Sequence, residues 1–173
     1  MAEYWNKYKV AVRDNMATFG KYTKTMLLMG LTAEVGKLWQ CTMNEIAGQG
    51  TNQEERQLSL GDILWYVAAM ELHFGLPSSV HTRYISTPMN LSPDHGLDLF
   101  GMQNKISNEL GVLAKNIKDQ ALSDLQYTLN QLLAKFYDVF IYYSVEPLAT
   151  LKESVEIMEE ENKPEVIDHQ KEF

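Results

Sequence analysis

The spacing of apolar residues constrains the fold of this chain more than any other feature of its sequence. Between residues 22 and 46 they recur mostly three or four positions apart, and the other long segments show similar spacing. This period places apolar side chains on one face of an α-helix. Only 10 glycines and 5 prolines interrupt the 173 residues, so the helices can be long. We therefore expect an all-α protein that folds as a helical bundle.

Capping and turn-forming residues indicate where the helices begin and end. Thr51 or Asn52 is the expected N-cap of the third helix, and Glu146 with Pro147 opens the last one. Pro77 can open a short helix that ends near residue 86. The longer helices are expected over residues 3–17, 22–46, 52–74, 97–118 and 121–145.

The charge and the cysteine content exclude several classes of protein. A net charge of −8 without any basic run argues against general nucleic-acid binding, which needs clustered Lys and Arg. The single cysteine, Cys41, excludes an intrachain disulfide and a cysteine zinc cluster. The first residues do not resemble a signal peptide, and no apolar stretch is long enough to span a bilayer. We expect a cytoplasmic protein that does not bind membranes.

Two pairs of segments suggest an internal repeat. The alignment places Glu34 on Glu109 and Asp62 on Asp138. Apolar positions of any two core helices can match by chance, but a chance match is less expected for acids that recur at matched places. The paired segments are "AEVGKLWQ" (33–40) with "NELGVLAK" (108–115), and "SLGDILWYV" (59–67) with "KFYDVFIYY" (135–143).

The repeat predicts a division of the chain into two halves. The expected units are a first half over residues 1–87, a loop over 88–96, a second half over 97–164 and a charged tail over 165–173.

Two acids of the first half stand among residues that should be buried. Glu34 lies on the second predicted helix and Asp62 on the third, and antiparallel packing of these helices could bring the acids together. Buried carboxylates are costly unless they are paired or bind a metal. Four acids arranged as two pairs, three residues apart in each pair, would form an oxygen cage for Mg²⁺.

The stretches "LLMGLTAEVGKLWQ" and "LSLGDILWYVAAMELHFGLPSSV" resemble the all-α NTP pyrophosphatase superfamily, which includes the MazG-like and dimeric dUTPase proteins. The match is clear over about residues 20–86, and the second half resembles a degenerate copy. The resemblance implies two MazG-like halves in tandem and a Mg²⁺-dependent cleavage of nucleoside triphosphates to monophosphate and pyrophosphate. In that family the metal is held by a Glu-x-x-Glu pair and a Glu-x-x-Asp pair.

This chain departs from the family pattern at two of the four acids. Glu34 and Asp62 match the first and last acids, but Lys37 and Ser59 stand at the other two positions. The second half also lacks two acids, since its equivalents of the four positions are Glu109, Val112, Lys135 and Asp138. A lysine beside the remaining carboxylates repels a cation, so the sequence predicts an impaired Mg²⁺ site.

Further residues are candidates for a site around these acids, each with a simpler alternative. Glu55 lies seven residues before Asp62 and could replace a metal ligand, or it could be a solvated glutamate of the first helical turn. Lys37 and Lys24 could contact phosphates, with Ser59 beside them. Trp39 and Trp65 could stack on a base, although packing in the core is the simpler role.

Three functions stay open on this pattern. The first is a MazG-like pseudoenzyme that binds a nucleotide or a nucleotide-derived signal with little or no hydrolysis, which would be useful to a phage that withholds such a signal. The second is an active metal-dependent NTP or dNTP pyrophosphohydrolase with unusual ligands. The third is a helical protein-interaction module, in which the charged residues form a buried ion network. A homodimer or a protein partner is compatible with each of them.

Overall fold

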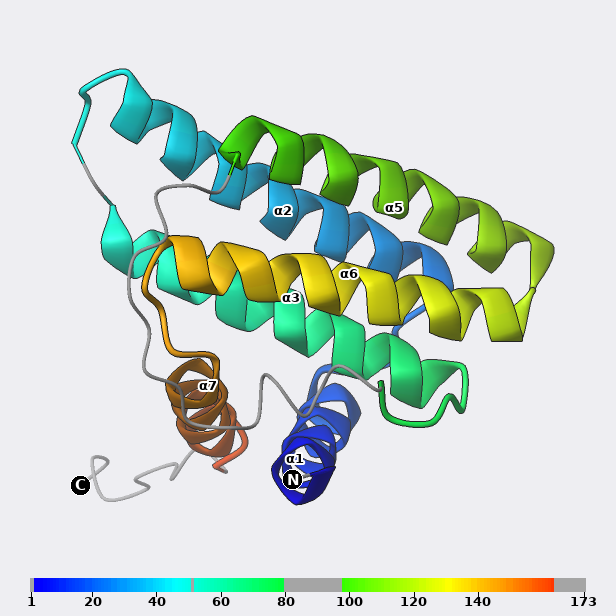
Figure 1. Cartoon of the computed structure of the whole chain (residues 1–173). Coiled ribbons are helices and arrows are strands. Elements are labelled where there is room, and N and C mark those ends of the chain that lie inside the picture. Colours follow the sequence, from blue (N-terminus) through cyan, green and yellow to red (C-terminus); the bar gives the residue numbers. More distant parts are fainter. Residues whose placement is uncertain (1, 51, 80–97, 164–173) are drawn as a thin grey trace, which may run out of the picture.

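In a computed structural model of the chain, which describes residues 2–50, 52–79 and 98–163, all regular secondary structure is α-helical. The predicted all-α helical bundle is therefore confirmed (Figure 1). Across the described part of the chain, no helix combines the length and apolar character that crossing a bilayer requires. The helices are α1 (Ala2–Phe19), α2 (Lys24–Ile46), α3 (Gln53–His73), α5 (Leu99–Asp119), α6 (Leu122–Tyr142) and α7 (Pro147–Glu161).

The predicted helix boundaries agree with these bounds to within a few residues. Asn52 is the N-cap of α3, and its side chain accepts a hydrogen bond of 3.2 Å from the backbone N–H of Glu55. Residues 77–79 are not helical, so the helix expected to open at Pro77 does not begin there. The remainder of that expected helix, the loop over 88–96 and the tail over 165–173 lie outside the described residues.

Two helical hairpins form the main body of the molecule. Helices α2 and α3 pack together as the first hairpin, and α5 and α6 pack together as the second. Figure 1 shows the hairpins side by side, with α5 next to α2. Each predicted half thus contributes one hairpin, while a common origin of the two halves stays a prediction.

Helix α3 is central because other helices cover most of its surface. It packs against α2, α1 and α7, and the last two run across the hairpins rather than along them (Figure 1). Its apolar side chains are accordingly buried on several faces. Four of them, Leu60, Ile63, Leu64 and Val67, are completely buried. Each contributes roughly 1.5–3 kcal/mol as an upper estimate.

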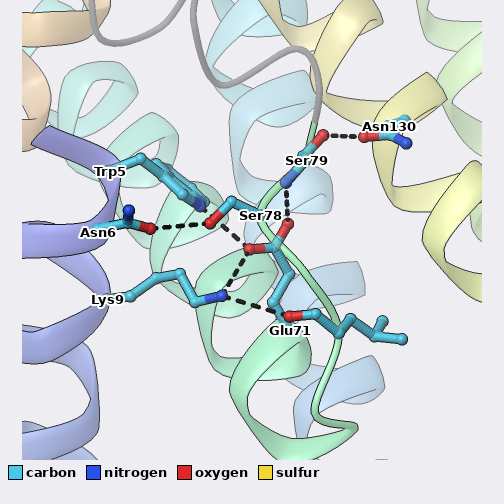
Figure 2. Close-up of polar contacts among 8 residues, drawn as sticks. Trp5, Asn6, Lys9, Glu71, Ser78, Ser79 and Asn130 are labelled. Atoms are coloured by element: carbon cyan, nitrogen blue, oxygen red, sulfur yellow. Dashed lines mark hydrogen bonds and ion pairs between the residues drawn. The ribbon is translucent and has the colours of Figure 1, made fainter. Parts of the chain in front are cut away.

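A buried carboxylate near the C-terminal end of α3 fixes α1 against it. Glu71 is fully buried, and its Oε2 accepts a 3.1 Å hydrogen bond from the indole Nε1 of Trp5. The same oxygen forms a 3.2 Å ion pair with Lys9 Nζ, and Oε1 accepts a 2.8 Å hydrogen bond from the backbone N–H of Ser79 (Figure 2). Burial raises the pKa of Glu71, while the Trp5 and Lys9 contacts lower it.

The chain that follows α3 extends this network to other helices. Ser78 Oγ donates a 3.0 Å hydrogen bond to the side-chain oxygen of Asn6 on α1, and Ser79 Oγ bonds the side-chain oxygen of Asn130 on α6. Figure 2 shows these side chains converging from three helices on the segment after α3. One buried acid therefore helps to position α1, this segment and the second hairpin.

We predict that Glu71→Ala destabilises the protein by about 3–5 kcal/mol, because Lys9 and the Trp5 indole lose their buried partner. Glu71→Gln should be destabilised less than Glu71→Ala, since its side-chain oxygen keeps one of the two acceptors, although its NH₂ group then faces a donor. Urea unfolding followed by tryptophan fluorescence measures both changes. Glu3→Ala, which removes an exposed ion pair with Lys7, is the control and should leave the midpoint nearly unchanged. Equal midpoints for the Glu71→Ala variant and the wild type would contradict this role.

Candidate functional site

A cavity of about 240 Å³ lies between α3 and α7, with further walls from α1 and α2. This volume is below the roughly 300–1,000 Å³ of pockets for drug-sized ligands, so the cavity suits a small ligand or part of a larger one. Its lining combines carboxylates, aromatic rings and small polar side chains, among them Asn15, Tyr22, Glu34, Asp62, Trp65, Tyr66, Ser154 and Glu161.

Glu34 contributes a half-satisfied carboxylate to this cavity. The residue is only 8% exposed, and its Oε1 accepts a 2.8 Å hydrogen bond from Lys37 Nζ, one turn along α2. Its Oε2 is buried without a hydrogen-bond partner. The side chain of Lys37 keeps 56% of its surface exposed, and Lys37 itself is not among the residues that line the cavity. An unpaired buried carboxylate oxygen is costly unless a ligand supplies a donor.

Asp62, on α3, also lines the cavity, and its charge interacts with that of Glu34 on α2. Burial of its carboxyl group and the negative charge of Glu34 raise the pKa of Asp62 to about 6, with a further contribution from Glu161. Lys37 acts in the opposite direction. The residue still has access to solvent, so the carboxylate can meet a ligand that enters the cavity. At pH 7 the carboxyl group of Asp62 is therefore still mostly ionised.

Helix α7 supplies the opposite wall of the cavity and two more acids. Glu153 accepts a hydrogen bond from Gln57 Nε2 on α3, and Glu161 accepts one of 3.1 Å from Asn15 Nδ2 on α1. These contacts connect α7 to its neighbouring helices across the cavity.

Three aromatic rings form the apolar part of the lining. The rings of Tyr22 and Trp65 meet edge to face with centroids 5.3 Å apart, and those of Trp65 and Tyr66 meet similarly at 5.0 Å. Trp65 and Tyr66 are only partly buried. Aromatic faces that border a cavity can pack against a planar ligand or a cation.

The structure brings together part of the residue set that the sequence predicts. Glu34, Asp62 and Trp65 line the cavity, and Lys37 binds Glu34. Ser59 is buried one turn before Asp62 and is not among the residues that line the cavity.

Three other predicted residues lie away from it. Glu55 is exposed at the start of α3, where its side chain bonds Asn52, so its role is that of a first-turn glutamate. Trp39 is 6% exposed and packs in the core, and Lys24 does not line the cavity.

The second hairpin contains a related pair of charges. Lys135 Nζ lies 3.0 Å from Glu109 Oε1, and both side chains are largely buried. Burial raises the pKa of Asp138, while Lys105 and Lys135 lower it. In each half, two of the four positions that carry acids in the resembled family carry another residue. One of these residues is a lysine in each hairpin, and it forms an ion pair with the glutamate that remains.

Sequence reasoning missed the contribution of α7 and of the tyrosines. Glu153 and Glu161 line the cavity, although no motif in the sequence marks either of them as a site residue. Nothing in the sequence distinguishes Tyr22 and Tyr66 from core residues, since aromatic side chains more often pack in a core. Of the three rings, only Trp65 was a candidate for the site.

The side chains around Glu34 do not fit a Mg²⁺ cage. Magnesium prefers octahedral oxygen ligands, and here a lysine already holds one of the Glu34 oxygens. Within the described ranges, no three His, Cys, Asp or Glu side chains are grouped so that they could hold a metal ion. The donor set suits hydrogen bonding to a ligand better than coordination of a metal.

Comparisons of this chain with protein-family models, curated proteins and solved structures found no match. The geometry of the cavity is therefore the basis for assigning a function.

We predict that Asp62 makes the protein less stable as the pH rises from about 4 to about 6. Its pKa of about 6 in the folded state exceeds the ordinary 3.8, so the folded state binds more protons than the unfolded state between these values. Asp62→Asn should flatten that part of the pH profile and stabilise the protein at pH 7.5.

Urea unfolding of the wild type and the variant at pH 4.5 and 7.5 measures the effect. Asp119→Asn, at an exposed position on α5, is the control and should retain the wild-type profile. The prediction fails if Asp62→Asn and the wild type lose the same stability between the two pH values.

Proposed function

We propose that this chain is a MazG-like protein that binds a nucleotide or a nucleotide-derived ligand and hydrolyses it weakly or not at all. The observation that carries the proposal is the 2.8 Å contact between Lys37 Nζ and Glu34 Oε1 beside the cavity. An ammonium group lies where the resembled family has an acid, while the cavity next to it persists. Binding without metal-dependent chemistry follows from that combination.

Charge explains why hydrolysis would be lost. In the resembled family four carboxylates hold the metal that polarises the phosphoryl oxygens and activates water. Lys37 supplies one positive charge and three hydrogen-bond donors, but it cannot coordinate a water molecule and lower its pKa. Ser59 does not compensate, because a buried hydroxyl brings no negative charge.

Size and charge indicate which part of a nucleotide would enter. The 240 Å³ cavity is lined by Glu34, Asp62, Glu153 and Glu161, and a phosphate chain inside it would face all four acids. The nucleoside part fits better, with its base against Trp65 and Tyr66. The phosphates would then stay outside, within reach of the exposed ammonium of Lys37.

We predict no release of monophosphate and pyrophosphate when the wild type is incubated with each NTP or dNTP and Mg²⁺ or Mn²⁺. The double variant Lys37→Glu/Ser59→Glu restores the four-acid pattern and should gain hydrolysis that EDTA abolishes. Chromatography of the products measures both reactions. Lys118→Glu/Ser123→Glu makes the same replacements at exposed positions of the second hairpin and should stay inactive.

A stability measurement keeps this test informative if the buried glutamate at position 59 perturbs the fold. Lys37→Glu alone places two acids one turn apart and should gain a Mn²⁺-dependent rise in melting temperature that the wild type lacks. EDTA-sensitive hydrolysis by the wild type would overturn the proposal in favour of an active pyrophosphohydrolase. If no nucleotide shifts the wild-type melting curve in EDTA, the binding function is refuted.

A further inference from the structure

An aromatic ring of α3 packs directly on a glycine of α2. A Cβ atom placed on Gly30 would come closer than 3.0 Å to the Cζ, Cε1 and hydroxyl oxygen atoms of Tyr66. Such distances are essentially never seen around a real Cβ atom. The Tyr66 ring therefore occupies the space that any side chain at position 30 would need.

The ring, rather than the backbone, explains the glycine at position 30. Gly30 is not among the residues with a positive φ, so its backbone conformation is open to other amino acids. Inside a helix glycine is less favourable than alanine. Gly36 on the same helix provides the contrast, because a Cβ atom there would meet nothing within 4 Å. Alanine thus fits at position 36, whereas at position 30 it requires the ring to move.

The ring that packs on Gly30 is also part of the cavity wall. Tyr66 lines the cavity, and its ring meets that of Trp65 edge to face with centroids 5.0 Å apart. Burial raises the pKa of the Tyr66 hydroxyl group, and the charges of Glu34 and Asp62 raise it further. Gly30 itself is not among the residues that line the cavity, so it affects this wall through the ring.

We propose that Gly30 is a positioning residue for the candidate site, because its missing side chain lets the Tyr66 ring rest on α2 and so fixes the aromatic wall against which a ligand packs. A larger residue would move the ring rather than the helix, since the ring is the end of a side chain with two rotatable bonds, whereas α2 packs along α3. The inference rests on the proposed function for the identity of the ligand. The position of the ring can be measured without one.

The test introduces Gly30→Ala and its control Gly36→Ala, each into the wild-type protein and into Tyr66→Ala. Urea unfolding first establishes which variants fold cooperatively. If Gly30→Ala does not fold but Gly30→Ala/Tyr66→Ala folds as Tyr66→Ala does, overlap with the ring is the cause and the inference is supported. Failure of the double variant to fold, where Tyr66→Ala alone folds, would overturn it.

Quenching of tryptophan fluorescence by acrylamide, without ligand, then reports the position of the ring. Trp65 is partly buried and the other two tryptophans are at most 6% exposed, so Trp65 is the one most accessible to the quencher. We expect Gly30→Ala to change the quenching constant when Tyr66 is present and to leave it unchanged in Tyr66→Ala. The control should have no effect in either background.

Titration calorimetry with ATP, GTP, CTP and UTP in EDTA connects the ring to the ligand. For each nucleotide that binds the wild type, Gly30→Ala should lower the affinity roughly tenfold, as the loss of one contact between a base and an aromatic ring predicts. Gly36→Ala should keep the wild-type affinity.

The outcomes separate this inference from the function on which it rests. Unchanged quenching in Gly30→Ala, or unchanged affinity for a nucleotide that binds the wild type, would overturn the inference and leave nucleotide binding intact. If no nucleotide binds the wild type, the proposed function fails, and the quenching series alone decides whether Gly30 positions the ring.

Discussion

The buried carboxylate of Glu71 is the interaction on which the arrangement of the other helices depends. Burying a charge in the core is tolerated here because Trp5, Lys9 and the backbone of Ser79 supply three donors. These contacts fix α1 on α3. Through Asn15, α1 in turn bonds Glu161 of α7, so the wall of the cavity is positioned from the far end of α3. The site therefore depends on a polar network that contacts no ligand.

The two hairpins neutralise their buried glutamates in different ways. In the first, Lys37 lies one turn after Glu34 on the same helix, whereas in the second, Lys135 reaches Glu109 from the neighbouring helix. Both lysines stand where the resembled family would have an acid, but at different positions of the four-residue pattern. Separate losses in two copies of one ancestral site would produce this difference, and a single inherited ion pair would not.

The sequence predicts local features of this molecule better than its long-range contacts. Periodicity and caps are local, so the helices could be read directly and the N-cap of α3 could be narrowed to Thr51 or Asn52, and the three-residue spacing already placed Lys37 beside Glu34. Which face of α3 meets α7 depends on packing between distant segments, so the cavity acids of α7 were missed. For the same reason the sequence did not distinguish Trp39 from Trp65, whose local surroundings are similar. Trp39 packs in the core, whereas Trp65 lines the cavity.

Ligand binding and metal-dependent hydrolysis are separable in this fold, because different residues around the cavity would perform them. The resembled metal site needs acids from α2 and α3 alone, whereas the cavity also has walls from α1 and α7. Lys37 and Ser59 stand at two of the four acid positions of the resembled family, whereas the aromatic residues and the α7 acids of the cavity lie outside that pattern. The lysine also limits the cost of the remaining carboxylates, since it holds one oxygen of Glu34 and opposes the rise in the pKa of Asp62. Substitutions confined to the acids of α2 and α3 would therefore change metal binding without altering the walls that α1 and α7 contribute.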